Sequence, residues 1–299
     1  MKKLTIIFVL FGLLSANGQQ TSIYSEYMFN QILINPALAG NNQSLNCSAL
    51  YRNQWVGIDE APQTATFTID VPLKSQKLGL GMNFTHDQIG VFANSNLAFN
   101  YAYHIQFGKS KLSMGLQGGA SNINANYSLL KYSRENDYID PAFSSNESTF
   151  NPIFGAGAYF QTNNFYIGLS MPNLIWGNTQ MFGYSQKKIA YISSGYVFEL
   201  SKNLMIKPSI LLRMASGASM NFDLNANIWI KKVVAFGVSY RYKDSFISLI
   251  EVKLNNNFRL GFSHDYNISS LAKFNKGSNE IMLKYQFNIE KCKYLTMQF

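Results

Sequence analysis

Long segments of this 299-residue chain place apolar residues at every second position. In the segment 97–107, for example, the odd positions are Leu, Phe, Tyr, Tyr, Ile and Phe, and the even positions are small or polar. Successive side chains of a β-strand point to opposite faces, so each segment is predicted to form a strand with one apolar and one polar face. The segments have 8 to 13 residues, about the length that a tilted strand needs to cross a bilayer.

Fourteen such segments can be placed along the chain. They cover residues 44–55, 63–71, 77–86, 95–107, 111–123, 152–161, 164–171, 189–199, 203–214, 219–230, 233–243, 246–254, 257–265 and 279–288. Short turns follow the even-numbered segments. Most odd-numbered segments are followed by longer connections, at 56–62, 87–94, 124–151, 172–188 and 266–278, although those at 215–218 and 244–245 are short.

This pattern predicts the fold class. An even number of strands with short periplasmic turns and long outer loops is typical of an outer-membrane β-barrel. We therefore predict an all-β fold, a transmembrane barrel of about 14 antiparallel strands with both chain ends in the periplasm. A secreted β-sandwich is the alternative.

The composition excludes several other classes. Charged residues make up 14% of the chain and aromatic residues 15%, which is too apolar for intrinsic disorder. No stretch approaches the roughly 20 apolar residues of a membrane-spanning helix. The chain has a net charge of +9, but its sequence contains no run of more than two basic residues, which argues against a nucleic-acid surface.

The N-terminus predicts export. Lys2 and Lys3 precede an apolar stretch at 4–14 and small residues at Ala16 and Gly18, which is the pattern of a secretory signal peptide. We divide the chain into a signal peptide at 1–18, a periplasmic or plug segment at 19–42, a barrel at 43–288 and a periplasmic tail at 289–299. The apolar residues between 24 and 34 are expected to pack on the inner wall of the barrel or on a partner.

The alternation also assigns charged residues to the lumen, because a charge on the lipid face near the midplane costs roughly 2–4 kcal/mol. Eight charged side chains lie opposite the apolar series: Lys207, Arg213, Asp223, Arg241, Glu251, Lys253, Arg259 and Lys284. They indicate either a basic wall that attracts an anionic ligand or segment, or an internal ion-pair network that holds a plugged barrel shut.

No pattern of catalytic or metal-ligating residues stands out. His86-Asp87 and His264-Asp265 are interpreted as polar residues at outer strand ends, and no cofactor is expected. Cys47 and Cys292 would lie on neighbouring strands of the closed barrel, and both a disulfide and two unpaired thiols stay open. We predict that the protein is not an enzyme.

Three segments carry a family resemblance. They are Tyr27-Met28-Phe29-Asn30 with Asn35-Pro36-Ala37-Leu38-Ala39-Gly40, then Tyr51–Ile58 with Ala61–Thr64, and finally Glu280–Phe287. In order, spacing and residue type they resemble the PorP/SprF family. The tail from Asn288 to Phe299 extends past the usual ending of that family.

The resemblance implies an outer-membrane component of the type IX secretion and gliding machinery. Family members work with periplasmic ring components, and some serve the export of surface proteins such as adhesins. On this basis we predict a non-enzymatic accessory or anchoring barrel; a passive or ligand-binding porin with a basic lumen is the alternative. The candidate partner-binding residues are Tyr27, Met28, Phe29, Asn30, Asn35, Pro36, Arg52, Gln54 and Trp55, and Trp55 is also interpreted as an aromatic anchor at the outer membrane surface.

Overall fold

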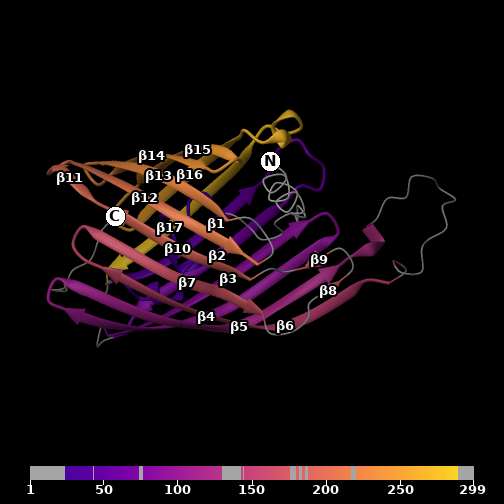
Figure 1. The fold of residues 1–299 in the computed structure, drawn as a ribbon, viewed down its shortest axis with the longest axis horizontal. Coiled ribbons are helices and arrows are strands. Elements are labelled where there is room, and N and C mark those ends of the chain that lie inside the picture. The colour runs from indigo at the N-terminus through magenta and orange to yellow at the C-terminus, as the bar shows by residue number, and fades with distance from the viewer. Residues whose placement is uncertain are drawn as a thin grey trace, which may run out of the picture.

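The computed structural model describes residues 24–42, 44–73, 77–129, 143, 145–175, 180–181, 184–185, 188–216 and 220–288. These residues form a β-barrel whose strands run side by side around a central lumen (Figure 1). The barrel strands are β1 (Ser44–Asn53), β2 (Gln63–Pro72), β3 (Leu78–Ile89), β4 (Phe92–Phe107), β5 (Ser110–Ala125), β6 (Glu147–Gln161), β7 (Phe165–Ile175), β10 (Ile189–Tyr196), β11 (Phe198–Ser201), β12 (Leu204–Ala215), β13 (Asn221–Ile230), β14 (Val234–Arg241), β15 (Ser245–Lys253), β16 (Phe258–Asn267) and β17 (Ser278–Asn288).

The sheet closes on itself. Each strand pairs with the next along the chain in antiparallel register, β1 pairs with β17, and β10 pairs with both β7 and β12. β10 and β11 flank Val197 and both pair with β12, so they are two parts of one strand. The described barrel therefore has 14 strand positions, and the predicted all-β, 14-stranded antiparallel barrel is confirmed.

One predicted loop is wrong. The connection expected at 87–94 is a two-residue turn, Gly90–Val91, because β3 and β4 continue their ladder up to the pair Ile89 and Phe92. Gly90 has a φ of +55°, a conformation that glycine adopts without steric cost. A two-stranded ribbon of β8 (Gln180–Met181) and β9 (Tyr184–Ser185) was also not predicted.

The two faces of the strands differ as the alternation predicts. The outer face carries exposed apolar side chains on every strand; they include Phe99, Leu116, Phe154, Leu169, Val238 and Phe262. The inner face carries buried polar residues such as Asn100, Gln117, Asn227 and Ser263. No helix within the described ranges has the length and hydropathy to cross a membrane.

The barrel has two distinct ends. The short-turn end holds the connections at 73–77, 108–109, 162–164, 202–203, 231–233 and 254–257, together with the start of β1 and the end of β17. The long-loop end holds the connections at 54–62, 90–91, 126–146, 176–188, 216–220, 242–244 and 268–277.

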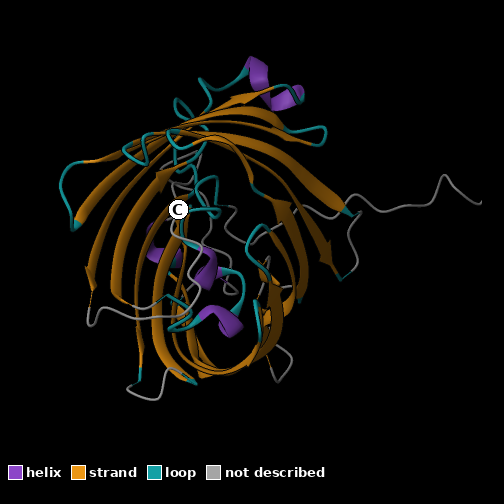
Figure 2. Cartoon of the chain, turned by 90° about the vertical axis from the view of Figure 1, so that its left-hand side faces the viewer, coloured by secondary structure: helices purple, strands orange, loops and turns teal. Residues whose placement is uncertain are grey.

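Residues 24–42, which we call the plug segment, lie inside the ring of strands (Figure 2). The segment contains two one-turn 3₁₀ helices, η1 (Gln31–Leu33) and η2 (Pro36–Leu38). Its apolar side chains form the core of the barrel with inward residues of the strands, among them Leu50, Leu211, Trp229 and Met282. The apolar side chains of this segment, whose exposure to water would be unfavourable, are therefore buried in the lumen.

Candidate functional site: the plugged lumen

The plug segment passes through the length of the lumen. At the long-loop end, the Tyr24 carbonyl accepts a hydrogen bond from Nη2 of Arg241, close to the end of β14, at 3.3 Å. At the short-turn end, the Asn41 carbonyl accepts one from Nζ of Lys111, the second residue of β5, at 2.8 Å. The described chain thus begins at the end opposite to the start of β1.

The turn near the short-turn end follows from the sequence Asn35-Pro36. The Asn35 side chain caps η2 by accepting from the Ala37 amide at 3.0 Å, and proline is favourable in the first helical position that follows. Nδ2 of Asn35 also donates to the Ala158 carbonyl of β6 at 3.1 Å. One side chain therefore shapes the plug segment and attaches it to the wall.

The same half of the plug segment packs on the wall at backbone distance. A Cβ atom at Gly115 would overlap the backbone of Pro36 and Ala37, and one at Gly79 would overlap the Ala39 carbonyl. The Ala39 carbonyl also lies 3.0 Å from Nε2 of His104. Glycine is required at these two wall positions because the plug backbone occupies the space of a side chain.

At the long-loop end, three arginines and three acidic residues form one buried ion-pair network. Its bonds are Arg213–Asp223 at 2.7 Å, Arg241–Asp223 at 3.3 Å, Arg241–Asp265 at 3.1 Å, Arg52–Asp265 at 2.7 Å and Arg52–Glu280 at 3.0 Å. All six side chains are at most 6% exposed. The network links β1, β12, β13, β14, β16 and β17, including the strand pair that closes the barrel.

The network also binds the plug segment. Glu280 accepts the backbone amides of Ser25 at 2.9 Å and Glu26 at 2.7 Å. The Ser25 hydroxyl donates to Asp265 at 2.7 Å and accepts from Nη1 of Arg52 at 2.8 Å. Charge-assisted hydrogen bonds of this kind are stronger than neutral ones, so the ion pairs hold the plug as well as the wall.

Glu26 is a buried carboxyl group without a hydrogen-bond partner. It is fully buried and packs against Gly261 of β16. Burial, together with the nearby carboxylate of Glu280, raises the pKa of the Glu26 side chain well above its ordinary value of 4.5. Burial therefore favours the uncharged form of Glu26 in the plugged state, and the network around it contains equal numbers of positive and negative side chains.

Between the two ends, the plug segment contacts the wall through mixed apolar and polar groups. The Phe29 and Trp229 rings meet edge to face with 6.1 Å between their centroids. Nζ of Lys284 donates to the Phe29 carbonyl at 3.1 Å. The Asn30 amide and the Thr68 hydroxyl are 3.1 Å apart, and Ser170 donates to the Ile34 carbonyl at 2.6 Å.

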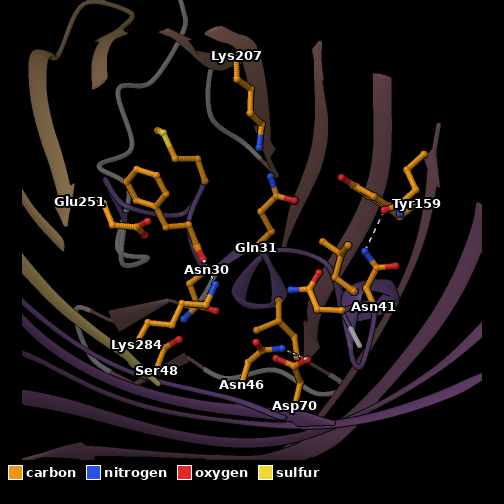
Figure 3. A pocket seen from close by; sticks show the side chains of 16 residues that line it. Asn30, Gln31, Asn41, Asn46, Ser48, Asp70, Tyr159, Lys207, Glu251 and Lys284 are labelled. Atoms are coloured by element: carbon orange, nitrogen blue, oxygen red, sulfur yellow. Dashed lines mark hydrogen bonds between the residues drawn. The ribbon is translucent and has the colours of Figure 1, made fainter. Parts of the chain in front are cut away.

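A polar cavity of about 100 Å³ lies between the plug segment and the wall in the short-turn half. Figure 3 shows Gln31, Asn30 and Lys284 lining it from one side and Asn41 and Tyr159 from the other. A polar cavity of this size is large enough to hold water.

All eight charged residues predicted for the lumen belong to the inward series of their strands. Arg213, Asp223 and Arg241 are in the ion-pair network, and Arg259 pairs with Glu251 at 2.7 Å. Nζ of Lys207 lies 5.1 Å from the centre of the Tyr166 ring, Lys284 binds the plug segment, and Lys253 is half-buried. Their predicted functional roles stay predictions.

The candidate partner-binding residues fall into two groups. Seven of them are buried within the barrel: Tyr27, Met28, Phe29, Asn30, Asn35, Pro36 and Arg52. Gln54 and Trp55 follow β1 at the long-loop end, where the Trp55 amide donates to the Ser278 hydroxyl at 3.2 Å. Cys47 is half-buried on the outward face of β1, and Cys292, the signal peptide and the tail 289–299 lie outside the described residues.

Sequence reasoning missed two acidic members of the network, Asp265 and Glu280. Asp265 was interpreted as a polar rim residue, and Glu280 only as part of the closing motif. The alternation in the sequence could have identified both residues. Asp265 is in the same alternating series of β16 as Gly261 and Ser263, which face inward, and Glu280 is in the same series of β17 as Lys284. The described residues contain no group of three or more histidine, cysteine or acidic side chains that could hold a metal ion.

Comparisons with known proteins bear on family and fold. A family model described as "Type IX secretion system membrane protein PorP/SprF" matches residues 16–285. Among solved structures, the CymD monoaromatic hydrocarbon channel is 11% identical, with 92% of this chain and 94% of that chain covered and a TM-score of 0.51. The outer membrane protein Omp33 of Acinetobacter baumannii is 9% identical, with coverages of 82% and 98% and a TM-score of 0.47. The search of curated proteins found no match.

Proposed function

The chain belongs to the PorP/SprF family of type IX secretion system membrane proteins, and we propose that it acts in that machinery as a closed accessory barrel. It is a multi-pass β-barrel of the cell outer membrane. In our proposal it anchors periplasmic ring components, serves the export of surface proteins and catalyses no reaction. Exported chains do not pass through its own lumen.

The plugged lumen is the observation that carries this proposal. Wall residues at both ends of the barrel bind main-chain atoms of the plug segment. Arg241 donates to the Tyr24 carbonyl at one end, and Lys111 donates to the Asn41 carbonyl at the other. A porin needs a continuous aqueous lumen, whereas here Tyr27, Phe29 and Ile34 belong to the apolar core. Five of the eight predicted lumen charges form ion pairs within the wall, and Lys284 binds the plug segment, which favours the network interpretation over an open basic channel.

A reversible lock of the plug segment tests this role. Cysteines replace Asn30 and Thr68, whose side chains are in hydrogen-bond contact, in a chain that also carries Cys47→Ser and Cys292→Ser. The control pair replaces Leu212 and Phe222, which are register partners on β12 and β13 and do not touch the plug segment. Each variant is returned to cells that lack the native gene.

We expect gene deletion to stop export of a surface protein and both locked variants to restore it. The wild-type chain in planar bilayers should show no steady conductance, with or without reductant. Loss of export in the Asn30–Thr68 lock alone, recovered by reductant, would mean that the plug must move and would overturn the closed role. Normal export after gene deletion would overturn the assignment to export itself.

A further inference from the structure

The short-turn end of the barrel is strongly basic, and the long-loop end is not. The six short connections contain six lysines and no acidic residue: Lys74, Lys77, Lys109, Lys202, Lys231 and Lys232. The long-loop connections contain seven basic and six acidic residues. The charge is therefore concentrated at the end that the predicted orientation places in the periplasm.

Five of these lysines can be located in the structure. Lys77, Lys109, Lys202, Lys231 and Lys232 are all exposed, and they belong to four different turns around the rim. We call these five residues the basic rim. Glu199 on β11 is an exposed acidic side chain close by, so it offsets one of these charges. A ring of like charges at one end creates a field that attracts an oppositely charged surface.

The turn between β13 and β14 gives independent support. Lys231 has a φ of +52° and Lys232 a φ of +56°, and the Val233 amide bonds to the Ile230 carbonyl at 3.0 Å. This is a tight hairpin with two left-handed residues, a geometry for which Asn-Gly is the favoured sequence. Two adjacent lysines add both backbone strain and like-charge repulsion at this position. Such local cost at an exposed site points to a function for the side chains.

We propose that the basic rim is the docking surface for an acidic face of a periplasmic protein partner. The proposal rests on the function argued above and adds the chemistry of the contact. The partner presents aspartate and glutamate side chains around a surface as wide as the barrel mouth. Phospholipid headgroups offer the same negative charge, and the test separates them from a protein surface.

The hairpin allows a test in which stability and binding change in opposite directions. Replacing Lys231 by Asn and Lys232 by Gly removes two rim charges and provides the favoured turn sequence. The control variant carries Lys243→Gly and Lys276→Asn, which removes two exposed charges at the long-loop end. Lys243 also has a positive φ, of +56°, so the control relieves strain in the same way.

The probe is a poly-L-glutamate chain added to the purified full-length protein in detergent at low and physiological salt. Each exposed ion pair contributes little, so losing two should weaken binding about five-fold. We expect this loss in the Lys231–Lys232 variant, together with unchanged or higher thermal stability, and unchanged binding in the control. Binding by the wild-type chain should weaken steeply with salt.

Three results would overturn the proposal. They are absence of poly-L-glutamate binding by the wild-type chain, equal losses in both variants, and binding that responds only to phosphatidylglycerol vesicles and not to poly-L-glutamate. The last result would assign the rim to lipid. If the proposed export role fails, gene deletion leaves export normal while poly-L-glutamate binding by the rim persists, so the two failures are distinguishable.

Discussion

The two halves of the plug segment are held in the lumen by different interactions. The half at the long-loop end, Tyr24–Asn30, is bound by the buried ion-pair network. The half at the short-turn end, Asn35–Asn41, packs on glycines of the wall at backbone distance. Single charged side chains also bind the short-turn half, Lys111 at the Asn41 carbonyl and Asp70 at the Gly40 amide, but only the long-loop half is bound by a connected ion-pair network. The first half is therefore the conditional one, and release of the plug is expected to begin at the long-loop end.

The largest test of this difference removes Arg52. Arg52→Leu leaves Asp265 and Glu280 buried without their shared cation, and breaking a buried pair in this way costs about 3–5 kcal/mol. We expect residues 24–30 to lose protection in amide hydrogen exchange while residues 35–41 keep it. Heat-modifiable gel mobility checks that the barrel itself still closes.

Arg259→Leu is the matched control. Arg259 also forms an ion pair on the inward face of the barrel, with Glu251, but this pair is not part of the network. Its effect on residues 24–30 should be small. Equal loss of protection in both halves after Arg52→Leu would show that the plug is released as one unit and would remove the distinction.

The second test acts on the packed half. Gly115→Ala places a methyl group in the space of the Pro36 and Ala37 backbone, and overpacking of this kind costs about 1–3 kcal/mol. Gly118→Ala, on the same strand, has no atom within 4 Å of the new Cβ and serves as the control. The free energy of unfolding in denaturant should fall for the first variant and stay constant for the second. A loss in both variants would point to the glycine-to-alanine change itself and not to the plug contact.

The contrast between the two halves also explains what could be predicted from the sequence. Strand positions and inward charges follow a local period of two, and Arg213, Asp223 and Arg241 lie in the inward series of their strands. The path of the plug segment depends on contacts between residues far apart in the chain, such as Ser25 with Asp265 and Asn35 with Ala158. No local pattern encodes those contacts. The composition of the segment indicates only that it is buried, and leaves the inner wall of the barrel and a partner as alternatives.

The third test uses pH on the ionic half. The pKa of the Glu26 side chain is raised in the plugged state. The stability that Glu26 gives to the plugged state is therefore fully present below the ordinary pKa and is lost as pH rises through the raised pKa. Glu280, Glu251 and Asp265 disfavour the charged form, and Arg52 favours it. The protection factors of residues 24–30, which correct for the base catalysis of exchange itself, should fall in the wild-type chain as pH rises from the ordinary pKa of 4.5 through the raised one. Glu26→Gln should remove this response and raise the protection of residues 24–30 at neutral pH, because glutamine resembles the protonated carboxyl and needs no proton uptake. An unchanged response would assign it to another group.

The smallest expected effect lies where the two halves meet. Thr68→Val removes the hydroxyl that is hydrogen-bonded to the Asn30 side chain at 3.1 Å and keeps nearly the same shape. A single hydrogen bond of this kind contributes about 1 kcal/mol. Thr66→Val is the comparison, because the Thr66 hydroxyl lies 3.2 Å from the Tyr24 hydroxyl, at the other end of the ionic half from Asn30. If the halves are independent, Thr68→Val raises exchange in residues 24–30 and leaves 35–41 unchanged. A rise of equal size in both halves would mean that Asn30 couples them, and the plug would then leave the lumen as one cooperative unit.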